Sequence, residues 1–211
     1  MRQSAVFGAI LGMVAGPALA DDACKEAVAA AFTKQRGGRV FTMASELKTP
    51  SGPVHIVVDY APPDRMRQTI TAPGQDPLET TLVGQRAYSR QGSNWQELMP
   101  AVAQTIIAQM REAAIEPPKD VGNFDCVGTT TLDGKEYLAY RSVEKQADAG
   151  APTGSPVMHR TIYVDPKTGL PARNVVAGEQ AGSEAVFNAT YEYPETVDIE
   201  DHPDAPLVKP R

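Results

Sequence analysis

The feature that most constrains this fold is a repeated alternation of apolar and polar residues in short segments. The alternation is clearest between residues 54 and 60, where every second residue is apolar or aromatic: Val54, Ile56, Val58 and Tyr60. A period of two places successive side chains on opposite faces of a β-strand. The patterning predicts strands at 41–47, 54–60, 65–71, 78–83, 86–90, 127–132, 136–143, 157–164, 170–177 and 185–193.

Two segments change to a helical period of about 3.6 residues. They are 21–34, before the first strand, and 100–115, between the fifth and the sixth predicted strand. Because the strands otherwise follow one another without helical crossovers, an antiparallel sheet is favoured over a parallel one. The expected fold class is α+β, a curved antiparallel sheet wrapped on a central helix.

The first twenty residues have the layout of a secretory signal peptide. Arg2 supplies a positive charge, an apolar run covers 5–15, and Ala18-Leu19-Ala20 provides the small residues that signal peptidase accepts. A membrane anchor is the alternative, but a span needs roughly 20 apolar residues. We therefore expect cleavage after Ala20 and a periplasmic protein that does not span the membrane.

Two cysteines, Cys24 and Cys126, are the only ones in the chain. In an oxidising compartment an even pair predicts a disulfide, and the alternative is two unpaired buried thiols. A bond would close a loop of about a hundred residues and stabilise the fold by about 4 kcal/mol. Lipidation of Cys24 is not expected, because Asp21 and Asp22 do not fit the apolar site that precedes a lipidated cysteine.

The length after the signal suits one domain, expected to span 21–195. Residues 144–156 are rich in Ala, Gly, Pro and Ser and predict a flexible loop. Residues 196–211 form an acidic, proline-rich tail that we expect to be disordered. The net charge of −6 argues against nucleic acid as a partner.

No motif in the sequence points to catalysis. The three histidines (His55, His159 and His202) have no metal-ligand spacing, and there is neither a Gly-x-Ser-x-Gly elbow nor a glycine-rich phosphate loop. We therefore predict no enzyme activity, no metal and no cofactor.

Several phrases resemble the superfamily of the periplasmic lipoprotein carrier LolA. They are Pro63-Asp64-Arg65-Met66-Arg67, the run from Leu82 to Tyr88, Trp95 with a helix soon after, and the run from Val164 to Arg173. The resemblance covers most of the chain after the signal. It implies an incomplete β-barrel in which helices cover an apolar cavity. In the carrier, an arginine at the position of Arg67 bonds to the helical lid and helps to govern its opening.

The candidate site combines this arginine with apolar residues of the strands. They are Met43, Ile56, Val58, Met66, Ile70, Leu82 and Tyr88. These side chains can line a cavity, or they can form a closed core against the central helix. The first reading predicts a binding protein for an apolar ligand, such as a lipid acyl chain or a lipoprotein. The alternative is a protein-interaction or envelope-sensor module, with an envelope protein as partner and no lipid cargo.

Overall fold

The computed structural model describes residues 20–144, 157–178 and 183–208. The signal segment and most of the loop predicted at 144–156 lie outside these ranges. The helices are α1 (Ala20–Gln35) and α2 (Pro100–Ala114). The strands are β1 (Phe41–Thr49), β2 (Gly52–Ala61), β3 (Arg65–Thr71), β4 (Leu78–Val83), β5 (Arg86–Gln91), β6 (Gln96–Glu97), β7 (Asp125–Leu132), β8 (Lys135–Glu144), β9 (Met158–Val164), β10 (Pro171–Gly178) and β11 (Ala185–Glu192).

All of these strands belong to one open sheet in the order β6-β5-β4-β3-β2-β1-β11-β10-β9-β8-β7. Every neighbouring pair of strands is antiparallel, as the sequence predicted. Each half of the sheet is a meander of chain neighbours, and the halves meet where β1 pairs with β11. The predicted curved antiparallel sheet with a helix against it is therefore confirmed.

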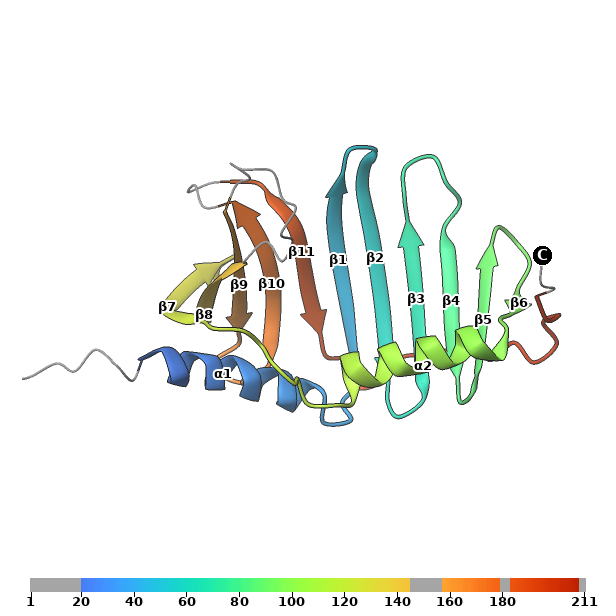
Figure 1. Cartoon of the computed structure of the whole chain (residues 1–211), viewed down its shortest axis with the longest axis horizontal. Coiled ribbons are helices and arrows are strands. Elements are labelled where there is room, and N and C mark those ends of the chain that lie inside the picture. The colour runs from blue at the N-terminus through green and yellow to red at the C-terminus, as the bar shows by residue number, and fades with distance from the viewer. Residues whose placement is uncertain (1–19, 145–156, 179–182, 209–211) are drawn as a thin grey trace, which may run out of the picture.

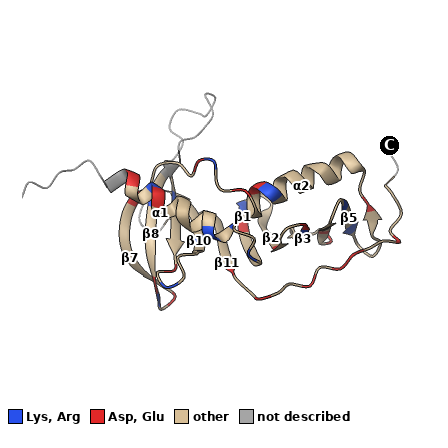
Figure 2. Cartoon of the chain, turned by 90° about the horizontal axis from the view of Figure 1, so that it is seen from below, with Lys and Arg blue, Asp and Glu red and all other residues tan. Residues whose placement is uncertain are grey.

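Both helices lie across the same end of the strands, α1 beneath β7–β10 and α2 beneath β1–β5 (Figure 1). Seen from below, they share one side of the sheet (Figure 2). We refer to this side as the helix face and to the opposite side as the outer face. The sequence predicted one helix against the sheet, whereas the structure places two end to end on it.

The packing beneath α2 follows one row of cross-strand neighbours. In this row Phe41 faces Tyr60, Tyr60 faces Met66, Met66 faces Leu82 and Leu82 faces Ala87. Directly opposed residues project from the same face of a sheet. Ala103, Met110 and Ala114 of α2 pack onto this row and form one core with it.

A second core lies beneath α1. Cys24, Val28, Ala31 and Phe32 of the helix pack against Tyr140 of β8 and Ile162 of β9. The predicted disulfide between Cys24 and Cys126 is present, with 5.4 Å between the two Cα atoms, and it ties α1 to β7.

The C-terminal segment differs from the sequence-based expectation. The sequence predicts disorder from residue 196, but residues 194–208, which we call the C-terminal strap, lie on the outer face (Figure 2). Arg65 donates a hydrogen bond to the carbonyl of Ile199 at 2.9 Å, and Ile199 is only 3% exposed. The strap ends beside β6, where Leu207 forms a parallel bridge with Glu97. Burial of Ile199 and these bonds order a segment whose composition alone predicts disorder.

Candidate ligand-binding site

Beyond α2, the helix face of the sheet continues as an apolar surface. Ile56 of β2 faces Ile70 of β3, and Ile70 faces Leu78 of β4. One row further from α2, Leu47 faces Val54 on one side and Phe187 of β11 on the other. The upper parts of these strands carry no helix across them (Figure 1).

The side chains of these two rows are partly open to solvent. Leu47 and Leu78 are 41% and 37% exposed, and the others are half-buried. Contiguous exposed apolar surface is uncommon on monomeric proteins and marks an interaction site. Five strands thus contribute to an apolar surface, which we call the open apolar face. It consists of Leu47, Val54, Ile56, Ile70, Leu78 and Phe187.

The structure divides the predicted site residues among three places. Val58, Met66 and Leu82 are at most 6% exposed and belong to the closed core beneath α2. Met43, Ile56 and Ile70 are half-buried on the same face, and Met43 and Ile56 pack at the border of that core. The two readings of the apolar strand faces therefore apply to different parts of one face: a filled core near α2 and an open surface beyond it.

Tyr88 and Arg67 lie on the outer face, apart from the other six. Thr81 faces both of them, Arg67 on β3 and Tyr88 on β5, whereas the apolar row continues through the neighbouring Leu82. The pattern of apolar residues alone predicts Tyr88 on the same face as the other apolar residues, and this prediction is wrong. The two-residue connection between Val83 and Arg86 could have corrected this, because it pairs Leu82 with Ala87 and leaves Tyr88 on the other side.

Arg67 is bonded within the sheet and does not reach α2. Its Nε and Nη2 atoms donate to Oδ2 of Asp59 at 3.0 and 2.6 Å. Asp59 is 7% exposed and also accepts a bond from the hydroxyl of Thr42 at 2.7 Å. The lid contact that the family resemblance implies for this arginine is therefore not made here, because α2 lies on the opposite face.

The strap closes a polar cavity of about 360 Å³ over Arg67 on the outer face. Glu79 and Arg90 of the sheet line it, and Asp198 and Glu200 of the strap line it from the other side. Arg90 donates to Glu79 at 2.9 Å, so its charge is already neutralised. Both arginines on its walls already have carboxylate partners, Asp59 for Arg67 and Glu79 for Arg90, so this cavity offers no free basic group to an anion.

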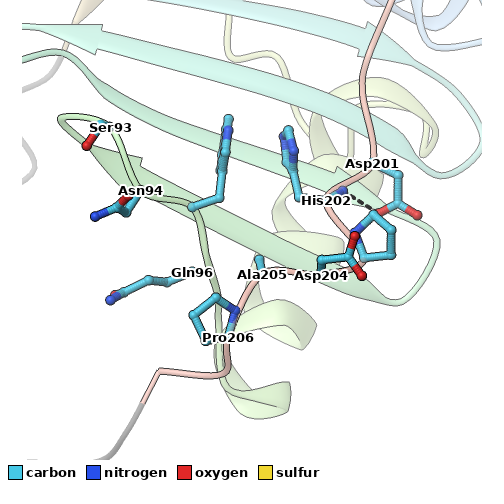
Figure 3. Close-up of a pocket in the computed structure, with 10 residues that line it drawn as sticks. Ser93, Asn94, Gln96, Asp201, His202, Asp204, Ala205 and Pro206 are labelled. Atoms are coloured by element: carbon cyan, nitrogen blue, oxygen red, sulfur yellow. Dashed lines mark hydrogen bonds between the residues drawn. The ribbon is translucent and has the colours of Figure 1, made fainter.

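An aromatic stack fastens the strap near its end. The ring of His202 lies 3.8 Å from that of Trp95 and nearly parallel to it, and Arg90 lies 4.9 Å from the centre of the Trp95 ring. Figure 3 shows His202 facing the segment that carries Asn94 and Gln96. Nothing in the sequence indicates a contact between Trp95 and His202, because they are more than a hundred residues apart in the chain.

Two hydrogen bonds continue this attachment along the edge of the sheet. The amide of Glu97 donates to the carbonyl of Pro206 at 2.9 Å, and the amide of Val208 donates to the carbonyl of Glu97 at 2.8 Å. The Glu97 side chain receives two bonds from Arg86, at 2.9 and 2.7 Å. This ion pair holds the pKa of Glu97 below its usual range. Together these bonds cover the short edge strand β6.

Neither helix in the described part of the chain is long and apolar enough to cross a membrane.

Comparison with known proteins identifies the fold but no close relative. No protein-family model and no curated protein matches the sequence. The lipoprotein LppX of Mycobacterium tuberculosis superposes with a TM-score of 0.55 at 15% identity, over 85% of this chain and 100% of LppX. LprF of Mycobacterium bovis superposes with a TM-score of 0.56 at 12% identity, over 85% and 97% of the two chains. A LolA superfamily protein of Nitrosomonas europaea aligns over 87% of this chain and 96% of its own, at 9% identity and a TM-score of 0.31. The chain therefore shares the fold of LppX and LprF, an open antiparallel sheet with helices on one face.

Proposed function

We propose that this chain is a periplasmic binding protein for an apolar ligand, such as the acyl chain of a lipid or of a lipoprotein. The observation that carries the proposal is the row Ile56–Ile70–Leu78. These side chains project from the same face as the core beneath α2, but they lie beyond the helix and are partly exposed. An acyl chain lying on this row would gain about 0.8 kcal/mol for each buried methylene. The signal sequence at 1–20 supports a periplasmic location.

The chemistry of the open apolar face favours binding over catalysis. Its members carry no ionisable or nucleophilic group, and the nearest polar row consists of uncharged Gln68, Thr80 and Ser89. Such a surface can hold a chain in place by burial, with no group to activate a bond. The proposed role is therefore to shield an apolar segment from water.

Organic extraction of the purified mature protein, followed by mass spectrometry, tests the proposal first. We expect one or more acyl-containing compounds in stoichiometric amount. A titration with cis-parinaric acid, whose fluorescence rises in an apolar environment, then gives an affinity for the protein after lipid removal. Absence of both co-purified lipid and saturable probe binding would refute the proposal.

Two neighbouring residues of β2 provide matched variants for locating the site. Ile56 projects onto the open apolar face, whereas Val57, 39% exposed, projects from the outer face. Ile56→Glu places a charge under the proposed chain, and we expect about tenfold weaker probe binding or more. Val57→Glu should leave the affinity unchanged. Equal effects of the two substitutions would contradict the assigned face.

A second candidate function is supported by the far edge of the sheet. Strand β7 pairs with β8 alone among the described strands, and most of its residues are exposed, including Val127 at 48%. An unpaired edge can accept a strand from another protein by backbone hydrogen bonding. An envelope-protein partner without lipid cargo would fit this edge, and it is favoured if the extraction yields no lipid while a specific protein co-purifies.

A further inference from the structure

Two arginines on the helix side of the sheet have few partners. Arg36 directly follows α1, and its Nη1 atom donates to the carbonyl of Glu116, just after α2, at 3.3 Å, so it lies between the ends of the two helices. Arg160 is on β9, and its Nε atom donates to the side-chain oxygen of Asn174 at 3.2 Å. Both are half-buried. The register places Arg160 on the helix face, two strands from the seam between β1 and β11.

A continuous set of contacts links the two guanidinium groups. Arg36 lies 5.9 Å from the centre of the Phe32 ring, and Phe32 contacts Tyr191 edge-on at 6.4 Å. Asn174, which accepts the bond from Arg160, lies on β10 next to the strand of Tyr191, and Tyr191 interacts electrostatically with both arginines. Tyr191 thus stands between the two cations and helps to fix their separation.

The donors of these arginines are largely unused. A guanidinium carries five N–H groups, and each arginine makes one hydrogen bond within the described part of the chain. The Nε atom of Arg36 is buried and has no partner there. Neither arginine forms an ion pair with a described carboxylate, whereas Arg67, Arg86, Arg90, Arg111 and Arg173 all do.

Arg36 is partly desolvated. Burial is the largest influence on its pKa and lowers it, whereas Tyr191, Glu112 and Tyr60 raise it, and the charge of Arg160 lowers it by the smallest amount. A partly desolvated cation with unused donors gains from a ligand of opposite charge.

Strand register connects the arginines to the open apolar face. Arg160 faces Val176 of β10, Val176 faces Phe187 of β11, and Phe187 faces Leu47 of β1. On its other side Arg160 faces Ser142 of β8, so the row is apolar from Val176 to Leu47 and polar at Arg160 and Ser142. Strands β9 and β3 are separated by five strand spacings, which correspond to roughly 24 Å. This distance is comparable with the length of an extended long acyl chain.

We infer that the ligand is an anionic amphiphile, with its acyl chain on the open apolar face and its carboxylate or phosphate at Arg36 and Arg160. The inference rests on the proposed function and adds the chemistry of the head group. Planar guanidinium groups bind both anions through paired hydrogen bonds. Arg36 and Arg160 would act as binding residues that set the orientation of the chain.

Competition against bound cis-parinaric acid by three amphiphiles of equal chain length tests the inference. Palmitate carries a carboxylate, palmitoyl lysophosphatidate carries a phosphate, and hexadecanol is neutral. We expect at least one anionic competitor to bind about tenfold more tightly than hexadecanol, as charge-assisted hydrogen bonds would provide. The preferred anion identifies the source of the charge.

Substitutions of Arg160 connect this preference to the site. Arg160→Gln should remove most of the preference and leave hexadecanol affinity unchanged, while Arg160→Lys should retain part of it. Arg173→Gln is the matched control, because Arg173 lies on the outer face of the adjacent strand and bonds to Asn188 at 2.8 Å. It should not change any of the three affinities.

The outcomes separate this inference from the proposed function. Equal binding of palmitate, lysophosphatidate and hexadecanol by the unmodified protein overturns the inference and leaves the apolar site intact. Equal weakening of all three by Arg160→Gln, with a lowered melting temperature, assigns Arg160 a structural role and also overturns it. If no amphiphile binds, the proposed function fails and the inference fails with it.

Discussion

In the half of the sheet formed by β7–β11, a covalent bond holds α1 in place, whereas in the half formed by β1–β6 only noncovalent packing holds α2. The bond joins Cys24, which is 1% exposed, to the edge strand β7. On α2, Ala103, Met110 and Ala114 face the sheet, while Met99 and Val102 near its start are 37% and 39% exposed. The helix bordering the open apolar face is therefore expected to be the more easily displaced of the two, which would suit the apolar ligand proposed above.

On the outer face it is the β1–β6 half that has the additional attachment. The strap crosses the β1–β6 half, bonding to Arg65 on β3 and to Glu97 on β6. The strap therefore holds the strands of the β1–β6 half on the face opposite α2. With the strands held in this way, α2 can move while the strands keep their positions.

Removal of the disulfide should have the largest effect on stability. The bond closes a loop across a sequence separation of 102 residues, and Cys24→Ala with Cys126→Ala should lower the free energy of unfolding by about 4 kcal/mol. Chemical denaturation measures the loss. Hydrogen exchange should rise in α1 while the native fluorescence of Trp95, the single tryptophan, stays unchanged. A change in Trp95 fluorescence would show that loss of the bond also disturbs the β1–β6 half.

A core truncation beneath α2 should have the next largest effect. Leu82 is 1% exposed, and Leu82→Ala should destabilise the protein by about 3 kcal/mol because it leaves a cavity under the helix. Leu78→Ala, on the same strand and face but 37% exposed, is the control and should cost less than about 1 kcal/mol. Similar losses for both would show that the face is closed at Leu78 as well.

Alkaline pH should weaken the α2 half through Tyr60. Burial raises the pKa of Tyr60 to about 12, from an ordinary value of 10.0. Because the folded state holds the proton more tightly, this stability is complete below pH 10 and is lost as the pH rises towards 12, by about 2 kcal/mol. The difference in unfolding free energy between the unmodified protein and Tyr60→Phe, measured from pH 9 to 12, isolates this residue. A difference independent of pH would contradict the assignment.

The strap should contribute the smallest of these effects. His202→Ala removes the ring stacked on Trp95 and should cost about 1 kcal/mol, with a shift in Trp95 emission. Asp204→Ala, exposed in the same segment, should change neither quantity. An unchanged emission spectrum in the His202 variant would indicate that the strap does not rest on Trp95 in solution.

The parts of the fold that the sequence predicted are those with local signals. Alternation located the strands, a helical period located both helices, and export with two cysteines predicted the disulfide. The strap was missed because its anchors, Ile199 and His202, bind residues more than a hundred positions earlier, in a segment whose composition indicates disorder. Arg36 and Arg160 were missed for the same reason. The partner of Arg36, Glu116, is 80 positions away, and only the registers of β9 with β10 and of β10 with β11 bring Arg160 into line with the apolar residues.

The pairing of β1 with β11 at the centre of the sheet has a consequence for how the chain folds. Each half can form from hairpins between sequence neighbours, which close quickly. The seam needs Phe187 to Glu192 to reach β1, so it cannot form before the chain up to residue 192 is available. Until then both seam strands have an unpaired edge, and we expect this to be the stage at which the protein is most prone to aggregation and most dependent on chaperones.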